Sequence, residues 1–151
     1  MEMKKTDQIE LTIPANHKYL NIVSACLEAL FERDDMLKTN KDDFYAIQLG
    51  VHEACTNVVD HAYKDIRDAN IYITVELWAE PARLIVDIRD TGKGFDPEKI
   101  PGPDFGGLQI RGFGIHLVHQ LMDGVIYFSA KDGNHWCLTK HFQSGISQNK
   151  K

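Results

Sequence analysis

The chain has 151 residues, of which 43% are hydrophobic and 26% charged, which is typical of one ordinary globular domain. Seventeen Lys and Arg against 22 Asp and Glu give a formal charge of −5, which argues against a protein that binds nucleic acid by neutralising phosphates. No apolar run approaches the roughly 18 residues of a membrane span, and the N-terminus lacks the apolar stretch of a signal peptide. Three well-separated cysteines without a Cys-x-x-Cys spacing indicate reduced core thiols in a cytoplasmic protein.

The first third of the chain predicts one strand and two helices. Apolar residues alternate with polar ones over 9–13, which predicts a half-buried strand that Pro14 closes. Asn16 is placed to cap the helix that follows, whose apolar side is formed by Leu20, Val23, Leu27 and Leu30. A polar stretch over 32–41 then leads to a longer helical pattern over about 42–63.

The rest of the chain predicts four strands and one short helix. Alternation over 71–77 and 84–88 predicts a hairpin. A helical pattern over 115–122 precedes two strand-like runs, at 125–129 and 135–142. Paired strands with helices gathered between them predict an α+β fold, a two-layer α/β sandwich with a mixed, mostly antiparallel sheet.

A long irregular segment separates the second predicted hairpin strand from the short helix. Residues 92–114 hold seven of the 11 glycines and three of the five prolines. Long irregular segments in small domains are usually functional or mobile.

Three polar side chains line one side of the longer predicted helix. On a helical wheel Glu53, Asn57 and His61 fall on one stripe beside the apolar face, spaced i, i+4 and i+8. Gly50 shares this stripe, and a small residue there would let a ligand approach the backbone. The plainer interpretation is an amphipathic helix whose polar boundary carries these residues. A zinc-protease helix is excluded, because Thr56 stands where the second histidine of that motif is needed.

An acidic residue and two glycines follow the second strand of the predicted hairpin. Asp90 stands at the strand end, where a carboxylate can point into a pocket, and Gly92 and Gly94 let the next backbone turn tightly and approach a ligand. Taken alone, a plain Asp-x-Gly turn is the simpler interpretation.

A second glycine motif, Arg111-Gly112-Phe113-Gly114, opens the short helix. Backbone N–H groups at a helix start favour phosphate, and the guanidinium of Arg111 adds a fixed positive charge. Neither a Walker P-loop nor a Rossmann fingerprint is present, so each glycine motif is weak evidence by itself.

Together and in this order, the motifs resemble the N, G1 and G2 boxes of the GHKL ATPase superfamily. The three blocks are Glu53–Tyr63, Asp90–Asp96 and Arg111–Gly114. The first block is particularly similar to the small anti-sigma-factor serine-protein kinases of bacterial partner-switching systems. The resemblance implies a Bergerat-type sandwich that binds ATP between its helices and its sheet.

The resemblance also implies how the chain is divided. It covers about residues 8–142 as one ATP-binding kinase domain, with 95–110 as a flexible lid. Residues 1–7 are then expected to be a flexible N-terminus and 143–151 a frayed tail. Because no residues remain for the phosphoacceptor hairpin of a sensor kinase or for a transducer domain, we expect the domain to act on a partner in trans.

Carried over position by position, the resemblance gives each residue a role. Glu53 is expected to orient or deprotonate the attacking hydroxyl, Asn57 to coordinate Mg²⁺, and Asp90 to accept a hydrogen bond from the adenine amino group. The other residues expected to contact the nucleotide are His61, Gly92, Gly94, Arg111, Gly112, Gly114 and Asn134. The last family box usually reads Gly-Thr, so Asn134 is a departure on the adenine side.

The function that the resemblance implies is an ATP- and Mg²⁺-dependent serine/threonine-protein kinase. It would phosphorylate a small antagonist protein and hold a sigma factor in its other complex. Two alternatives stay open: a non-enzymatic ATP-binding anti-sigma or signalling module, and a globular adaptor that binds no nucleotide. The family also implies a homodimer, formed through the N-terminal strand and helix, and we expect neither nucleic acid nor membrane among the partners.

Overall fold

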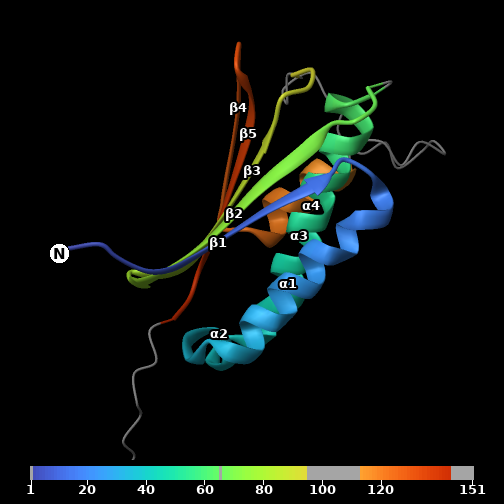
Figure 1. The fold of residues 1–151 in the computed structure, drawn as a ribbon. Coiled ribbons are helices and arrows are strands. Elements are labelled where there is room, and N and C mark those ends of the chain that lie inside the picture. Colours follow the sequence, from blue (N-terminus) through green and yellow to red (C-terminus); the bar gives the residue numbers. More distant parts are fainter. Residues whose placement is uncertain (1, 65, 95–112, 144–151) are drawn as a thin grey trace, which may run out of the picture.

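One layer of the protein is a five-stranded sheet, and helices cover one face of it (Figure 1). The computed structural model describes residues 2–64, 66–94 and 113–143. In chain order the elements are β1 (Lys4–Pro14), η1 (His17–Tyr19), α1 (Leu20–Arg33), α2 (Asp35–Thr39), η2 (Lys41–Asp43), α3 (Phe44–Asn57), η3 (Val58–Ala62), β2 (Asn70–Glu80), β3 (Ala82–Asp90), α4 (Phe113–Leu121), β4 (Gly124–Ala130) and β5 (Gly133–His141).

The strands lie in the order β1-β2-β3-β5-β4, and each neighbouring pair is antiparallel. The expected two-layer α+β architecture is confirmed, but the described sheet is antiparallel throughout rather than mixed. The reason is the connections: β2–β3 and β4–β5 are hairpins, and the second hairpin returns β5 to lie beside β3. The predicted hairpin over 71–88 turns at Glu80–Pro81, where the peptide bond is cis.

The core lies between the sheet and the helices, because every second residue of the inner strands is apolar. Cross-strand rows run over this face, for example Ile73 beside Ile88 and then Trp136. From the helix layer, α1 contributes Leu20, Val23 and Leu27, as its spacing predicts. None of the helices in the described ranges has both the length and the apolarity needed to cross a membrane.

Two segments differ from the sequence prediction. β1 begins at Lys4 and pairs with β2 from there, although residues 1–7 are expected to precede the domain. The polar stretch over 32–41 contains the short helix α2, whose N-terminus is capped by the Asp34 carboxylate accepting the Leu37 N–H at 3.0 Å. In both places the backbone forms its hydrogen bonds although the residues show no apolar periodicity, so the sequence pattern could not predict these elements.

The three cysteines are free and lie in different surroundings. Cys55 is fully buried in α3, and burial raises the pKa of its thiol to about 12. Cys26 and Cys137 are only half-buried, and burial raises the pKa of both thiols as well. Only Cys55 is therefore the core thiol that the sequence predicts for all three.

Candidate functional site

The polar stripe of α3 is present, but its first half is covered by another helix. The predicted core face is buried at Ile47, Val51, Ala54 and Cys55. A Cβ at Gly50 would lie 3.2 Å from both the Cγ and the Sδ of Met122, which follows α4. Gly50 therefore lets α3 and α4 pack closely, and the interpretation of this glycine as space for a ligand is wrong.

Beyond Gly50 the stripe continues along α3 with Glu53 and Asn57. Glu53 is half-buried, whereas Asn57, the last residue of α3, is only 9% exposed. The side-chain nitrogen of Asn57 is buried without a hydrogen-bond partner. Buried polar atoms almost always have a partner. This nitrogen alone does not mark a ligand site, however, because three other buried side-chain atoms of the described residues also lack one: Thr56 Oγ1, Arg83 Nε and Asp87 Oδ1.

The regular α-helix ends at Asn57 and continues as one π turn, η3. The turn is closed by the N–H of Tyr63 donating to the carbonyl of Val58 at 3.1 Å. His61 lies on this wider turn and is exposed, so the i, i+8 spacing of an α-helix no longer describes its position. Single π turns within helices are frequently found at functional sites.

On the sheet side, three polar residues continue the apolar cross-strand rows at the end of β3. Asp90, Asn134 and Ser129 are register partners across β3, β5 and β4. Asp90 follows Ile88 in the strand alternation, so its side chain points toward the helix layer, and it is only 3% exposed. The predicted acid of β3 and the amide of α3 therefore lie on the same side of the sheet.

The three residues form one hydrogen-bond network, in which Asp90 and Asn134 are buried and Ser129 is exposed. The amide nitrogen of Asn134 donates to Asp90 Oδ1 at 2.7 Å and to the carbonyl of Gly92 at 3.0 Å. The N–H of Gly92 donates to the same Oδ1 at 2.9 Å, and Ser129 Oγ donates to Asn134 Oδ1 at 2.6 Å. Both bonds to the carboxylate end on Oδ1, and Oδ2 accepts none from the described residues.

The charge state of Asp90 follows from this position. Burial raises the pKa of its carboxyl above the ordinary value, and this is the largest effect. The hydrogen bonds from Asn134 and Gly92 and the nearby charge of His135 lower the pKa and so oppose the shift. A buried carboxylate with one uncommitted oxygen can accept a hydrogen bond from a ligand amino group.

The turn after Asp90 is fitted against the end of the π turn. A Cβ at Gly92 would lie 2.2 Å from the carbonyl oxygen of Ala62, which real structures do not allow. The same oxygen accepts the N–H of Lys93 at 2.8 Å. At Gly94 a Cβ would lie 2.2 Å from Ser129 Oγ. Gly92 is therefore required by close packing against backbone, whereas the atoms nearest a Cβ at Gly94 would belong to the side chains of Ser129 and Asn134.

One contributor to this arrangement is absent from the sequence prediction. Tyr63, directly after the π turn, is 5% exposed, and its hydroxyl contacts both Asn70 and Thr91. A buried tyrosine hydroxyl usually has a hydrogen-bond partner. The sequence could have indicated Tyr63 only because it is the last residue of the first motif.

The predicted phosphate-side residues lie mostly outside the described part of the chain. Arg111 and Gly112 fall between the described ranges, as does the expected lid at 95–110. Gly114 lies in the first turn of α4. The structure therefore brings Glu53 and Asn57 and the Asp90 network to one side of the sheet.

A hollow of about 450 Å³ lies at the same end of the molecule but on the open face. It is lined by Tyr72, Arg89, Phe128 and His135, which alternate with the helix-facing residues of their strands, and it is bordered by the Asp90–Thr91 and Gly133–Asn134 segments. It lies behind the Asp90 network and is not the predicted space between Asp90 and Asn57.

Comparison with known sequences places these residues in a family context. The profile described as a histidine kinase-like ATPase domain matches residues 13–140. The serine-protein kinase RsbW of Halalkalibacterium halodurans is 32% identical over 133 residues, which cover 83% of this chain and 78% of that protein. RsbW of Bacillus subtilis is 30% identical over 127 residues, which cover 79% of this chain and 76% of that protein.

Solved structures share the fold at lower identity. The RsbU and RsbW domains of Rv1364c from Mycobacterium tuberculosis match with a TM-score of 0.62 and 17% identity, over 92% of this chain and 34% of that chain. The histidine kinase domain of the Erythrobacter litoralis EL346 blue-light activated kinase matches with a TM-score of 0.52 and 19% identity, over 85% of this chain and 61% of that chain.

Proposed function

Because the chain belongs to the histidine kinase-like ATPase domain family, and within it to the RsbW serine-protein kinases, we propose that it is an ATP-dependent serine/threonine-protein kinase and anti-sigma factor. Its substrate is a small antagonist protein of a partner-switching pathway, and a sigma factor is the alternative partner. The observation that carries this proposal is the position of Asn57, 9% exposed at the end of α3, on the side of the sheet to which buried Asp90 points.

Adenine is held at the Asp90 end of this site. Oδ2 of Asp90, which accepts no hydrogen bond from the described residues, accepts one from the adenine amino group, while Oδ1 is held by Asn134 and Gly92. Asn134 does not contact adenine itself but holds Asp90 through the hydrogen bond to Oδ1. This role explains why an amide can stand where the family usually has threonine. Guanine has a carbonyl oxygen at that position, and one charge-assisted hydrogen bond of about 1.5–3 kcal/mol is enough for at least a tenfold preference for adenine.

The phosphates and Mg²⁺ are held at the α3 end. The described residues contain no cluster of three His, Cys, Asp or Glu side chains able to bind a metal alone. The side-chain oxygen of Asn57, and not its nitrogen, would be the ligand, and one such oxygen fits Mg²⁺ because this ion usually takes one or two protein oxygens and fills its shell with phosphate and water. When bound, Mg²⁺ neutralises charge on the transferred phosphoryl group. The remaining phosphate contacts come from Arg111, Gly112 and Gly114, and His61 flanks the nucleotide.

Glu53 is the general base. It lies one helical turn before Asn57 on the stripe and is half-buried. It accepts the proton of the attacking serine or threonine hydroxyl as that oxygen bonds to the γ-phosphorus, and ADP leaves with the electron pair of the broken bond. A positioned base contributes about 10²–10⁴-fold to the rate.

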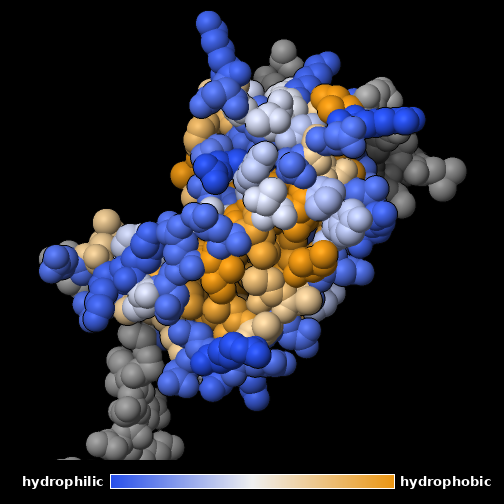
Figure 2. All heavy atoms as spheres, viewed as in Figure 1, coloured by the Kyte–Doolittle hydropathy of each residue, from blue (hydrophilic) through white to orange (hydrophobic). Residues whose placement is uncertain are grey.

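We further propose a homodimer in the cytoplasm. Apolar atoms are exposed along the seam between β1 and α1 in Figure 2. The apolar residues of these two elements that are not fully buried include Leu11, Ile22 and Leu30, and Ile22 is 48% exposed. Exposed apolar patches of this kind often mark protein–protein contacts.

The test is phosphoryl transfer with the purified protein, Mg²⁺ and γ-labelled ATP, offered to candidate antagonist proteins. We expect label on serine or threonine of one antagonist. Glu53→Gln should lose transfer by at least about 10²-fold. The same variant should keep its affinity for ATP, because Glu53 acts on the hydroxyl and not on the nucleotide. Failure of the wild-type protein to bind ATP would overturn the proposal. Binding without transfer to any antagonist would instead support a non-enzymatic ATP-binding module.

A further inference from the structure

The hydroxyl of Tyr63 joins three segments of the chain, its own and those that contain Asn70 and Thr91. It donates to the carbonyl of Asn70, at the start of β2, at 2.8 Å. It accepts the N–H of Thr91, directly after β3, at 2.7 Å, and Thr91 Oγ1 lies 3.2 Å away. The tyrosine itself follows the π turn at the end of α3. One side-chain atom thus connects the end of the α3 motif to both strands of the central hairpin.

This hydroxyl has little capacity left for another partner. A phenol carries one proton and accepts through its lone pairs. With the proton given to Asn70, the oxygen accepts from the Thr91 backbone and from the Thr91 hydroxyl. Because the side chain is also 5% exposed, these bonds face little competition from water.

A second contact beside it holds the same turn. The Ala62 carbonyl accepts the N–H of Lys93 at 2.8 Å, and no side chain fits at Gly92 between them. Residues 62–63 are therefore hydrogen-bonded to residues 91–93 on both sides of Gly92, through the Tyr63–Thr91 and Ala62–Lys93 bonds. The carboxylate of Asp90 accepts a hydrogen bond from the N–H of Gly92, so these two contacts also fix the position of the carboxylate.

We propose that Tyr63 is a positioning residue that fixes the adenine end of the nucleotide site relative to the phosphate end. This inference rests on the proposed function. Asn57 precedes Tyr63 by six residues, across the single π turn, and Asp90 immediately precedes the residue that Tyr63 holds. Tyr63 acts through the turn at 91–93 and does not touch the nucleotide.

Without the hydroxyl, the turn samples positions in which Asp90 no longer meets adenine while Asn57 holds phosphate. The apparent dissociation constant rises by the inverse of the fraction of molecules that remain competent. We expect about a tenfold rise, since a lost hydrogen bond to a buried backbone group is of that size. The step that uses Glu53 is unaffected once ATP is bound.

The experiment compares Tyr63→Phe with Tyr45→Phe in the full chain. Tyr45 lies at the start of α3 and is 69% exposed, and its hydroxyl has no hydrogen bond to the described residues, so it is a matched control. Binding of ATP is measured by calorimetry well below the melting temperature, and transfer kinetics are measured with the antagonist. For Tyr63→Phe we expect Kd and KM for ATP to rise about tenfold and kcat to change by less than about threefold. Tyr45→Phe should match the wild type.

Several outcomes would overturn the inference. A lower melting temperature with Kd within about twofold of wild type would assign the hydroxyl to stability alone. A fall in kcat with unchanged Kd would assign it to the chemical step. Thr91→Val covers the case in which Tyr63→Phe does not fold, because Thr91 is exposed and only the 3.2 Å contact is lost. We expect about a two- to threefold rise in Kd for this variant, and no rise would count against the inference. If the wild type binds no ATP, the proposed function fails with it, and that result is distinguishable from each of these.

Discussion

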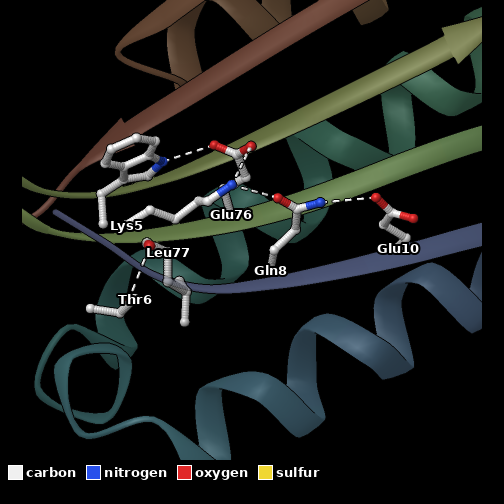
Figure 3. A network of polar contacts seen from close by, with 7 residues as sticks. Lys5, Thr6, Gln8, Glu10, Glu76 and Leu77 are labelled. Atoms are coloured by element: carbon white, nitrogen blue, oxygen red, sulfur yellow. Dashed lines mark hydrogen bonds and ion pairs between the residues drawn. The ribbon is translucent and has the colours of Figure 1, made fainter. Parts of the chain in front are cut away.

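Two hydrogen-bond networks lie at opposite ends of the sheet and have nearly the same bond lengths. In the first, shown in Figure 3, Lys5 Nζ donates to Gln8 Oε1 at 2.7 Å and Gln8 Nε2 donates to Glu10 Oε1 at 2.9 Å. In the second, around Asp90 and Asn134, the bonds run from 2.6 to 3.0 Å. These two bonds of Gln8 are exposed, whereas Asp90 and Asn134 are 3% and 1% exposed.

The two networks therefore differ in burial and not in the lengths of these hydrogen bonds. When a partner is removed at the surface, water takes its place. When a partner is removed from a buried network, the remaining polar group bears the full cost of being dry and unpaired. The Asp90 network is also joined to close backbone contacts, so its geometry has little freedom to adjust.

The largest effect should come from Gly92→Ala. The new Cβ would overlap the Ala62 carbonyl oxygen, so the turn must move away from the π turn. We expect a loss of about 3 kcal/mol in the free energy of unfolding, measured by urea denaturation. Gly124→Ala is the control, because its Cβ would meet Thr139 at 3.4 Å, an ordinary contact. Equal effects at both positions would contradict the close fit.

Asn134→Ala should follow in size. It removes the bond to Asp90 Oδ1 and the bond to the Gly92 carbonyl, and it leaves Ser129 Oγ without its acceptor. We expect a loss of about 2 kcal/mol in the same measurement. Ser129→Ala removes only one of these bonds and should cost about 1 kcal/mol. A smaller effect for Asn134→Ala than for Ser129→Ala would show that the network is not organised around the amide.

The Asp90 carboxyl should also make stability depend on pH. Its pKa is raised in the folded protein, so the native state holds the proton more tightly than the unfolded chain. The stability that this proton confers is present at low pH and is lost as the pH rises through the raised pKa. Asp90→Asn lacks this titration, so between about pH 4 and pH 7 its stability should improve relative to wild type. Parallel stability curves for the two proteins over this range would contradict the shift.

The smallest effect should come from the network of Figure 3. Gln8→Ala removes two exposed side-chain bonds between neighbours on β1. We expect a change within about 0.5 kcal/mol in the free energy of unfolding, since surface substitutions rarely exceed this. A loss comparable to that of Asn134→Ala would mean that bond length, and not burial, sets the cost.

The strands and helices that pack in the core could be predicted from the sequence, because their apolar residues repeat with a clear period. This holds for β2, β3 and β5 and for the buried side of α1. The first residues of β1 carry no such signal, since Lys4 to Gln8 are exposed on both faces and none of them packs in the core. The π turn could not be predicted either, because its backbone hydrogen bonds do not require particular residue types.

In the site, the sequence indicated which residues have suitable side chains, but it did not indicate which other residues they contact in the fold. Asp90, Asn57 and Glu53 could be singled out by the chemistry of their side chains and by their spacing. Gly50 could not be assigned from spacing, because it depends on how α4 crosses α3. The same holds for Tyr63, whose partners on β2 and after β3 are 7 and 28 residues away.

The unequal burial of the three thiols bears on how this molecule can be observed. Only the thiolate form reacts with maleimides, and the pKa of Cys55, at about 12, keeps that thiol protonated at neutral pH inside the core. Cys26 on the helix layer and Cys137 on the sheet remain partly accessible. A donor and an acceptor dye could therefore be attached to the natural chain, one on each layer, and would report on any movement of the helices against the strands.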